Sequence, residues 1–392
     1  MLRCFAAVAL LCSALRAETI LVLPFFNHSK SDLDWIGESI SESIHDSLAS
    51  EGLLLLDRDD RLEAYRRLSL RPGAELTHAS IMKIGQSLDA AHVIYGAYEL
   101  VPPVVGRDPA AGSLRISARI LDLNHLKQSA EFSELRALEE LAPLEAHLAW
   151  RALQYLNPNG APGEQEFMRE RRPVRLDAVE SYIRGLLAQT PEQRQRFFSQ
   201  AARLDEHYSP PAYQLGMTYW ANKEYQVAST WLARVDRANP HYLEAQFFLG
   251  ICWYYSGDFA GAEHAFQSVS MSVPLNEVYN NLGAAQNRRN NATGAIASFQ
   301  KALEGDSSDP DYYFNLGYAY WRSGKFAEAV ASLRSAVERN PSDPEATALL
   351  GRALKHEGPR PGDPRSEGRE RLKTNYEEAA YRQLQAELQS RH

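Results

Sequence analysis

Leu-Gly pairs recur at an almost constant interval through the C-terminal half of this 392-residue chain. Their glycines follow one another after 34, 33, 34 and 34 residues, and an alanine series and a proline series keep the same period. Three interlocked series at one period indicate a repeat architecture, in which stacked units bury a continuous core. The pairs are Leu215-Gly216, Leu249-Gly250, Leu282-Gly283, Leu316-Gly317 and Leu350-Gly351.

The spacing of apolar residues predicts two helices in each unit. In the first helix they stand four residues apart, as Tyr219 follows Leu215, and the second helix continues the pattern at four and then three residues. Between the helices stand Gly257, Asn290 and Gly324, which are residue types that accept the left-handed conformation ending a helix. Each unit is therefore predicted to be a helix-turn-helix, with small residues where the paired helices cross closely.

This pattern resembles the tetratricopeptide repeat (TPR) family, whose 34-residue unit has Leu-Gly and an aromatic residue in its first helix, Ala, Phe and Ala in its second, and Pro at its end. Four units ending at Pro341 match well, a degenerate first unit begins near Ala178, and a fifth unit starts at Glu345 and breaks at Gly358. The resemblance implies an all-α TPR superhelix over residues 176–358 that binds a protein or peptide partner in its concave groove.

First-helix residues that packing leaves free are predicted to line this groove. Aromatic side chains supply contact area, and amides pair with the backbone of an extended peptide. Asn281 and Asn315 each precede Leu-Gly, as in TPR proteins with an asparagine ladder, although Gln214 and Phe248 interrupt such a ladder here. The expected ligand of this groove is a mainly apolar, extended polypeptide. The alternative for each aromatic residue is that it packs between neighbouring units. The candidate groove residues are Tyr213, Met217, Trp220, Phe247, Ile251, Tyr254, Asn280, Asn281, Arg288, Phe314, Asn315, Tyr318, Trp321 and Arg322.

Residues 359–392 follow the repeats and begin with a proline-rich break. Beyond it, an apolar residue recurs every four positions on an otherwise charged stretch, which predicts a helix. Such a helix caps the last apolar face of a solenoid, or it docks a partner. The recurring residues are Leu372, Tyr376, Ala380, Leu384 and Leu388.

The pattern over residues 18–156 is of a different kind, because short apolar runs alternate with helical stripes. This alternation predicts an α+β domain with one mixed sheet and a helical layer. Its motifs resemble the N-terminal domain of TolB and related envelope-assembly domains. TolB itself continues with a β-propeller that is absent here, so TolB's own partners do not transfer. A turn-rich stretch opens a predicted linker, residues 157–175. Its basic segment, residues 169–175, is interpreted as a solvated face in preference to a binding site for an acidic partner. The motifs are Val22-Leu23-Pro24-Phe25, Gly37-Glu38-Ser39-Ile40, Gly96-Ala97-Tyr98 and Arg115-Ile116-Ser117-Ala118-Arg119.

Residues 1–17 have a basic start, an apolar run too short to span a bilayer, and small residues at the end. They predict a cleaved signal peptide and an exported protein, periplasmic or secreted. The alternatives are an uncleaved anchor, a buried strand and a lipoprotein with lipidation at Cys12. Cleavage after Ala17 leaves only Cys252, so the mature chain has no intramolecular disulfide and no cysteine metal cluster.

Charge and motifs argue against several functions. The formal net charge of −8 gives no footprint for nucleic acid, and phosphate-binding, hydrolase and zinc-protease motifs are absent from the sequence. The densest acidic group, Asp57-Arg58-Asp59-Asp60, is interpreted as a helix N-cap in preference to a metal site. We therefore expect no catalytic residue, metal or cofactor. The expected function is that of an exported scaffold for envelope assembly, which associates peripherally with the envelope or not at all. The alternative is an enzyme or small-molecule sensor that uses the N-terminal domain while the repeats recruit its substrate.

Overall fold

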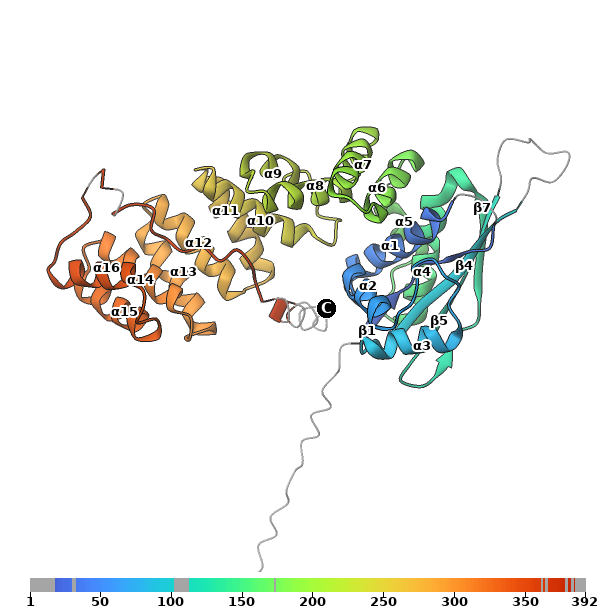
Figure 1. The fold of residues 1–392 in the computed structure, drawn as a ribbon, viewed down its shortest axis with the longest axis horizontal. Coiled ribbons are helices and arrows are strands. Elements are labelled where there is room, and N and C mark those ends of the chain that lie inside the picture. Colours follow the sequence, from blue (N-terminus) through green and yellow to red (C-terminus); the bar gives the residue numbers. More distant parts are fainter. Residues whose placement is uncertain are drawn as a thin grey trace, which may run out of the picture.

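A computed structural model describes residues 18–29, 33–101, 113–172, 174–360, 362–363, 366–377, 380–381 and 384, so the predicted signal peptide lies outside the described residues. A mixed sheet with flanking helices precedes a long run of helices (Figure 1), which confirms the expected fold class. The elements of the first part are β1 (Thr19–Val22), β2 (Phe26–Asn27), α1 (Trp35–Ser50), β3 (Leu54–Leu55), α2 (Arg58–Arg67), α3 (His78–Ser87), β4 (His92–Val101), β5 (Ser113–Asp122), β6 (Lys127–Gln128), β7 (Phe132–Ala137), η1 (Leu138–Glu140) and α4 (Leu141–Leu156).

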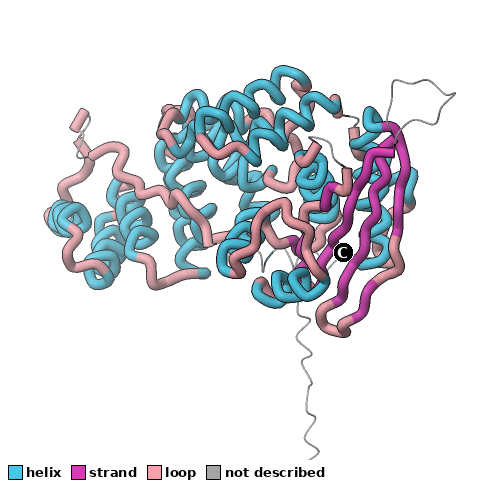
Figure 2. The backbone as a smooth tube through the Cα atoms, turned by 45° about the vertical axis from the view of Figure 1, so that its right-hand side comes forward, coloured by secondary structure: helices cyan, strands magenta, loops and turns pink. Residues whose placement is uncertain are grey.

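The sheet has the strand order β3-β1-β4-β5-β6, with β2 also paired to β4 and β7 to β5. β1 runs parallel to β3 and β4, whereas β4 and β5 form a long antiparallel pair. Figure 2 shows these strands as one layer beside the helices. Alternate residues of β1 point to opposite faces: Ile20 and Val22 pack in the core with α1 and α4, and Leu21 packs with α2 and α3. The sheet is therefore covered by helices on both faces.

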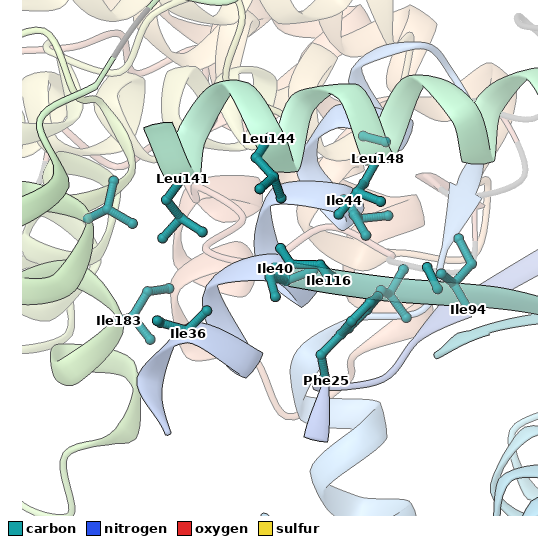
Figure 3. Packing of buried hydrophobic residues seen from close by; sticks show 14 of the residues in the cluster. Phe25, Ile36, Ile40, Ile44, Ile94, Ile116, Leu141, Leu144, Leu148 and Ile183 are labelled. Carbon is teal, nitrogen blue, oxygen red and sulfur yellow. The ribbon is translucent and has the colours of Figure 1, made fainter. Parts of the chain in front are cut away.

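The core under α1 and α4 extends beyond this domain. Figure 3 shows Ile40 and Ile44 of α1 facing Leu144 and Leu148 of α4, all fully buried. Ile183, from the first helix of the repeat region, joins the same core. The repeat region thus starts directly on the N-terminal domain.

Part of the predicted linker is packed against the first domain. Residues Glu164–Glu170 form α5, and the Phe167 side chain is fully buried. The Arg171 guanidinium lies 3.3 Å from the centre of the Phe167 ring and donates hydrogen bonds to the Ser47 carbonyl and the Glu51 carboxylate. The linker is therefore folded against the first domain around Phe167, and the partly buried Arg171 side chain departs from the solvated face predicted for residues 169–175. The position of the domain boundary stays a prediction.

The repeat region consists of paired helices. A Cβ atom at Gly250 would lie 2.7 Å from the Phe266 ring, and one at Gly283 would lie 2.8 Å from the Phe299 ring, so the pairs cross where the glycines stand. The helices are α6 (Leu176–Leu187), α7 (Pro191–Leu204), α8 (Pro210–Ala221), α9 (Tyr225–Leu232), α10 (Tyr242–Tyr255), α11 (Phe259–Ser272), α12 (Asn276–Arg288), α13 (Ala292–Gly305), α14 (Pro310–Arg322), α15 (Phe326–Arg339) and α16 (Pro344–Leu354).

The turn residues between paired helices adopt the conformation that the sequence predicts. Gly257, Asn290 and Gly324 have φ angles of 86°, 59° and 71°. Across the described part of the chain, none of the helices combines the length and the apolar character that a membrane crossing requires.

Candidate peptide-binding face

Residues 366–377, called the tail below, run back across the repeat region. Figure 1 shows the chain beyond α16 returning across α12 toward the middle of the array. None of the tail residues is helical, so the predicted C-terminal helix is wrong for Leu372 and Tyr376. Ala380 and Leu384 are helical, and Leu388 lies outside the described residues. The tail leaves the helical conformation because its backbone groups bond to side chains of α12 and α14.

Three asparagines supply bonds of this kind. They lie on the surface that α10, α12 and α14 turn toward the tail, called the inner face below. The Asn281 amide donates to the Lys373 carbonyl and accepts the Lys373 N–H, both at 2.8 Å. Asn315 makes the same pair of bonds with Arg371, also at 2.8 Å each. Asn280 lies between them and donates to the Arg371 carbonyl as well. The asparagines thus hold residues i and i+2 of an extended chain through backbone groups alone.

One acidic tail side chain is inserted into the inner face. The Glu370 side chain has no exposed surface, and its carboxylate accepts hydrogen bonds from Asn287 Nδ2 at 2.8 Å and from the Tyr254 hydroxyl at 3.1 Å. Arg322 Nη1 lies 3.6 Å away. Burial raises the pKa of Glu370 even though Arg288, Arg322 and the hydrogen bonds act in the opposite direction. This position therefore recognises a carboxyl group.

Two basic tail side chains meet an acidic cluster formed by Asp309, Asp311 and Asp343. Arg371 Nη1 lies 2.6 Å from Asp343 Oδ2 and 3.0 Å from Asp311 Oδ1. Lys373 Nζ lies 2.6 Å from Asp309 Oδ2 and 2.8 Å from Asp311 Oδ2. Burial acts to lower the pKa of both basic groups, but their bonds to the carboxylates outweigh it and raise both pKa values. This part of the inner face is selective for positive charge.

The tail also makes apolar and aromatic contacts. The Tyr376 ring meets the Phe247 ring edge-on, with centroids 5.4 Å apart. The Arg371 guanidinium lies 3.6 Å from the centre of the Phe314 ring, and Leu372 packs against the core of the middle units. The inner face therefore binds backbone, charged groups and rings of one extended segment.

The helical units match known families of repeats. Residues 213–269 and 314–358 match the family described as tetratricopeptide repeat, and residues 287–324 match one described as TPR repeat. The chain carries tetratricopeptide repeats. Known TPR repeats bind protein or peptide partners, and the paired helices with glycine crossings give this array the same construction.

Several solved structures, two of which are described as TPR proteins, are similar at low identity. YrrB, described as a TPR protein with an unusual peptide-binding site, is 18% identical, with 53% of this chain and 98% of that chain covered and a TM-score of 0.41. MamA from Desulfovibrio magneticus RS-1 is 23% identical, with 43% and 95% covered and a TM-score of 0.37. A thermophilic TPR protein of Thermus thermophilus is 19% identical, with 42% and 90% covered and a TM-score of 0.32.

One curated relative has a different description. Phycocyanobilin:ferredoxin oxidoreductase of Prochlorococcus marinus (strain MIT 9313) is 25% identical over a 190-residue alignment that covers 45% of this chain. The chain spans 64% of that protein's length. This match does not establish catalysis here.

The inner face brings many of the predicted groove residues together against the tail. Asn280, Asn281 and Asn315 bind its backbone, as described above. The Tyr318 hydroxyl donates to the Ser366 carbonyl at 2.9 Å. The other predicted residues that meet the tail are Phe247, Tyr254, Phe314 and Arg322, and Arg288 lies beside Gly368.

Other predicted groove residues pack within the TPR array instead. Tyr213 stacks on His241, with ring centroids 4.4 Å apart, and Trp220 lies 4.5 Å from the Phe248 ring. Trp321 is fully buried and donates its indole N–H to the Glu357 carbonyl. Ile251 is fully buried, and Met217 is partly buried against the same core. Whether any of these residues binds a partner stays a prediction.

The acidic cluster is the part of the inner face that the sequence analysis missed. Asp309 and Asp343 each stand before a proline at a helix start, a pattern that indicates an N-cap. Both do cap: the Asp309 side chain accepts from the Asp311 N–H, and the Asp343 side chain accepts from two N–H groups at the start of α16. The second oxygen of each carboxylate binds Lys373 or Arg371. The sequence signal that indicates this cluster is the pair of Asp-Pro caps together with the basic residues of the tail.

Around the densest acidic group of the N-terminal domain, Arg58 and Arg61 pair with the buried Glu38 carboxylate, and His45 Nε2 lies 3.8 Å from Asp57 Oδ1. Asp57 occupies the N-cap position of α2, as the sequence predicts, but its side chain makes no capping hydrogen bond; Asp59 and Asp60 lie in the first turn. Among the residues that the structure describes, no group of three or more His, Cys, Asp or Glu side chains is placed to hold a metal ion.

A cavity of about 490 Å³ lies elsewhere in this domain, against β4 and β5. Its lining includes the titratable side chains of His28, Glu75, His78, Arg115 and Arg119. Cavities of this size hold small ligands in other proteins, so this one is the place where a small molecule would fit.

Proposed function

We propose that this chain is an exported, non-enzymatic scaffold that binds an extended polypeptide on the inner face of its TPR array, in envelope assembly or organisation. The binding part rests on one observation. Asn281 and Asn315 each satisfy both backbone groups of one residue in an extended chain, which is how a protein binds a peptide without depending on its side chains.

Export and the envelope role rest on the sequence. The apolar run within residues 1–17 matches a signal peptide, and the motifs around Val22 and Arg115 resemble TolB-like envelope domains. A cleaved chain would place the N-terminal domain and the TPR array together in the exported compartment. There the first domain would attach the scaffold to envelope components while the array holds its partner.

Partner capture tests the binding part. We expect full-length protein purified from its native envelope to bring down a partner that the Asn281→Ala/Asn315→Ala variant does not. Asn239→Ala is the matched control, because Asn239 is also a buried amide of the array and bonds Ser209 Oγ and the His241 N–H away from the tail. Equal capture by all three proteins would place the interaction on another surface.

A second candidate function follows from the 490 Å³ cavity, in which the first domain would sense a small molecule. Native mass spectrometry of the protein from its host should then show a small adduct that is lost on Arg119→Ala. Arg66→Ala is a suitable control, since Arg66 is an exposed α2 residue paired with Glu63 outside the cavity. A bare protein mass in all three samples would remove this candidate.

A further inference from the structure

The inner face already holds a peptide, which is the tail of the same chain. α16 ends at Leu354 and the tail begins at Ser366, so the connection is short. The exit of the chain from α16 is fixed by two bonds to carbonyls, from Trp321 Nε1 to Glu357 and from Arg352 Nη2 to Gly358. A tethered segment of this kind has an effective concentration in the millimolar range.

The side chains that the tail presents fit the inner face at successive positions. Glu370 enters the carboxyl-binding position beside Tyr254 and Asn287. The next residue, Arg371, and the residue two further on, Lys373, fit the acidic cluster. The inner face thus binds a glutamate, an arginine and a lysine in the order Glu-Arg-x-Lys. Backbone hydrogen bonds at the arginine and the lysine fix the register of the segment.

We propose that the tail is a built-in competitor for the inner face, and that the partner presents an extended Glu-Arg-x-Lys segment that displaces it. This inference rests on the proposed binding function and names the chemistry of its ligand. The partner and the tail need the same asparagines and the same acidic cluster, so both cannot be bound at once. The chain is closed until a partner with this pattern replaces its own tail.

A labelled peptide with the sequence of residues 366–377 provides the test. Its affinity is measured by fluorescence anisotropy for the full-length wild type and for full-length Arg371→Glu/Lys373→Glu, whose own tail meets the acidic cluster with the wrong charge. We expect the variant to bind the peptide at least about 10-fold more tightly than the wild type does. This factor follows if the tethered tail has an effective concentration of about 1 mM and an intrinsic dissociation constant of about 100 µM. Lys355→Glu/Arg360→Glu changes the net charge equally outside the tail and should bind like the wild type.

Each outcome decides the inference. Equal affinity for wild type and variant would show that the tail does not compete. Failure of both proteins to bind the peptide would refute the Glu-Arg-x-Lys pattern, whereas the capture experiment above would still decide whether the array binds a partner. A wild-type mass of two chains by light scattering, falling to one chain on peptide addition, would assign the tail to the face of a second copy and refute intramolecular closure.

Hydrogen exchange on the wild type needs no substitution and supplies a second readout. The Arg371 and Lys373 amides bond to Asn315 and Asn281, so tail amides should exchange slowly and become faster when excess peptide is added. Tail amides that exchange at the rate of an unstructured peptide in the wild type would overturn the inference.

Discussion

Replacing Asn281 and Asn315 by alanine should release the tail from the inner face. Each asparagine makes two bonds of 2.8 Å to the tail backbone, one to a carbonyl and one to an N–H. At about 0.5–1.5 kcal/mol each, the four bonds contribute about 2–6 kcal/mol to docking. Even the lower end corresponds to roughly a 30-fold loss in the docking equilibrium.

Hydrogen exchange with mass spectrometry measures this release directly. In the double variant, amides of residues 366–377 should lose protection, while amides of α12 and α14 keep theirs because the helices retain their own backbone bonds. The variant also removes a bond between Asn315 and Asn280 within the face, so a modest fall in thermal stability is expected as well.

The matched control separates docking from general destabilisation. Asn239→Ala removes bonds of 3.1 Å to Ser209 Oγ and 2.9 Å to the His241 N–H, and it should lower stability without changing exchange in the tail. Undiminished protection of residues 366–377 in Asn281→Ala/Asn315→Ala would refute the reasoning, because the charged contacts alone would then hold the tail.

Three further predictions concern other parts of the chain. Burial raises the pKa of Glu145 from 4.5 to about 8, so the fold favours the protonated carboxyl. The contribution of this carboxyl to stability is fully present below pH 4.5 and is lost as the pH rises toward 8. In urea unfolding, Glu145→Gln should be about 4 kcal/mol more stable than wild type at pH 8 and within about 1 kcal/mol of it at pH 5. Gly283→Ala should cost about 1–3 kcal/mol in the same assay, because its Cβ would lie 2.8 Å from the buried Phe299 ring, whereas Gly351→Ala meets no atom within 4 Å and should cost nothing. Intact mass after expression in a native-like host should give a chain starting at Glu18, and a full-length chain would contradict export.

The repeat period was sufficient to predict the TPR helices and their crossings. Leu-Gly, alanine and proline positions each report a packing requirement that is local to one pair of helices, so no long-range information is needed. Gly250 and Gly283 lie where a Cβ atom would meet a phenylalanine ring, as the pattern implies. In the N-terminal domain, apolar runs and helical stripes predicted the strands and helices. They did not predict that Ile183 of α6 shares a core with Ile36 of α1, because that contact is long-range.

The tail shows where sequence periodicity fails. Leu372 and Tyr376 are four residues apart, as on one helix face, yet both lie in a non-helical segment that packs on the middle units. Helical spacing is weak evidence when another partner can satisfy the backbone, and here Asn281 and Asn315 provide that partner. These asparagines were predicted to bind a peptide, but nothing in the repeat pattern shows that the peptide belongs to the same chain.

The acidic cluster was missed for a different reason, which concerns the chemistry of a carboxylate. Asp343 was interpretable as an N-cap, and one of its oxygens does accept two N–H groups of α16. A carboxylate has two oxygens, however, and the second lies 2.6 Å from Arg371 Nη1. Because capping fixes the first oxygen, it also orients the second, so the helix starts hold the acidic cluster in place before any basic residue arrives. A cap motif at the rim of a binding surface is therefore compatible with a second role in recognition.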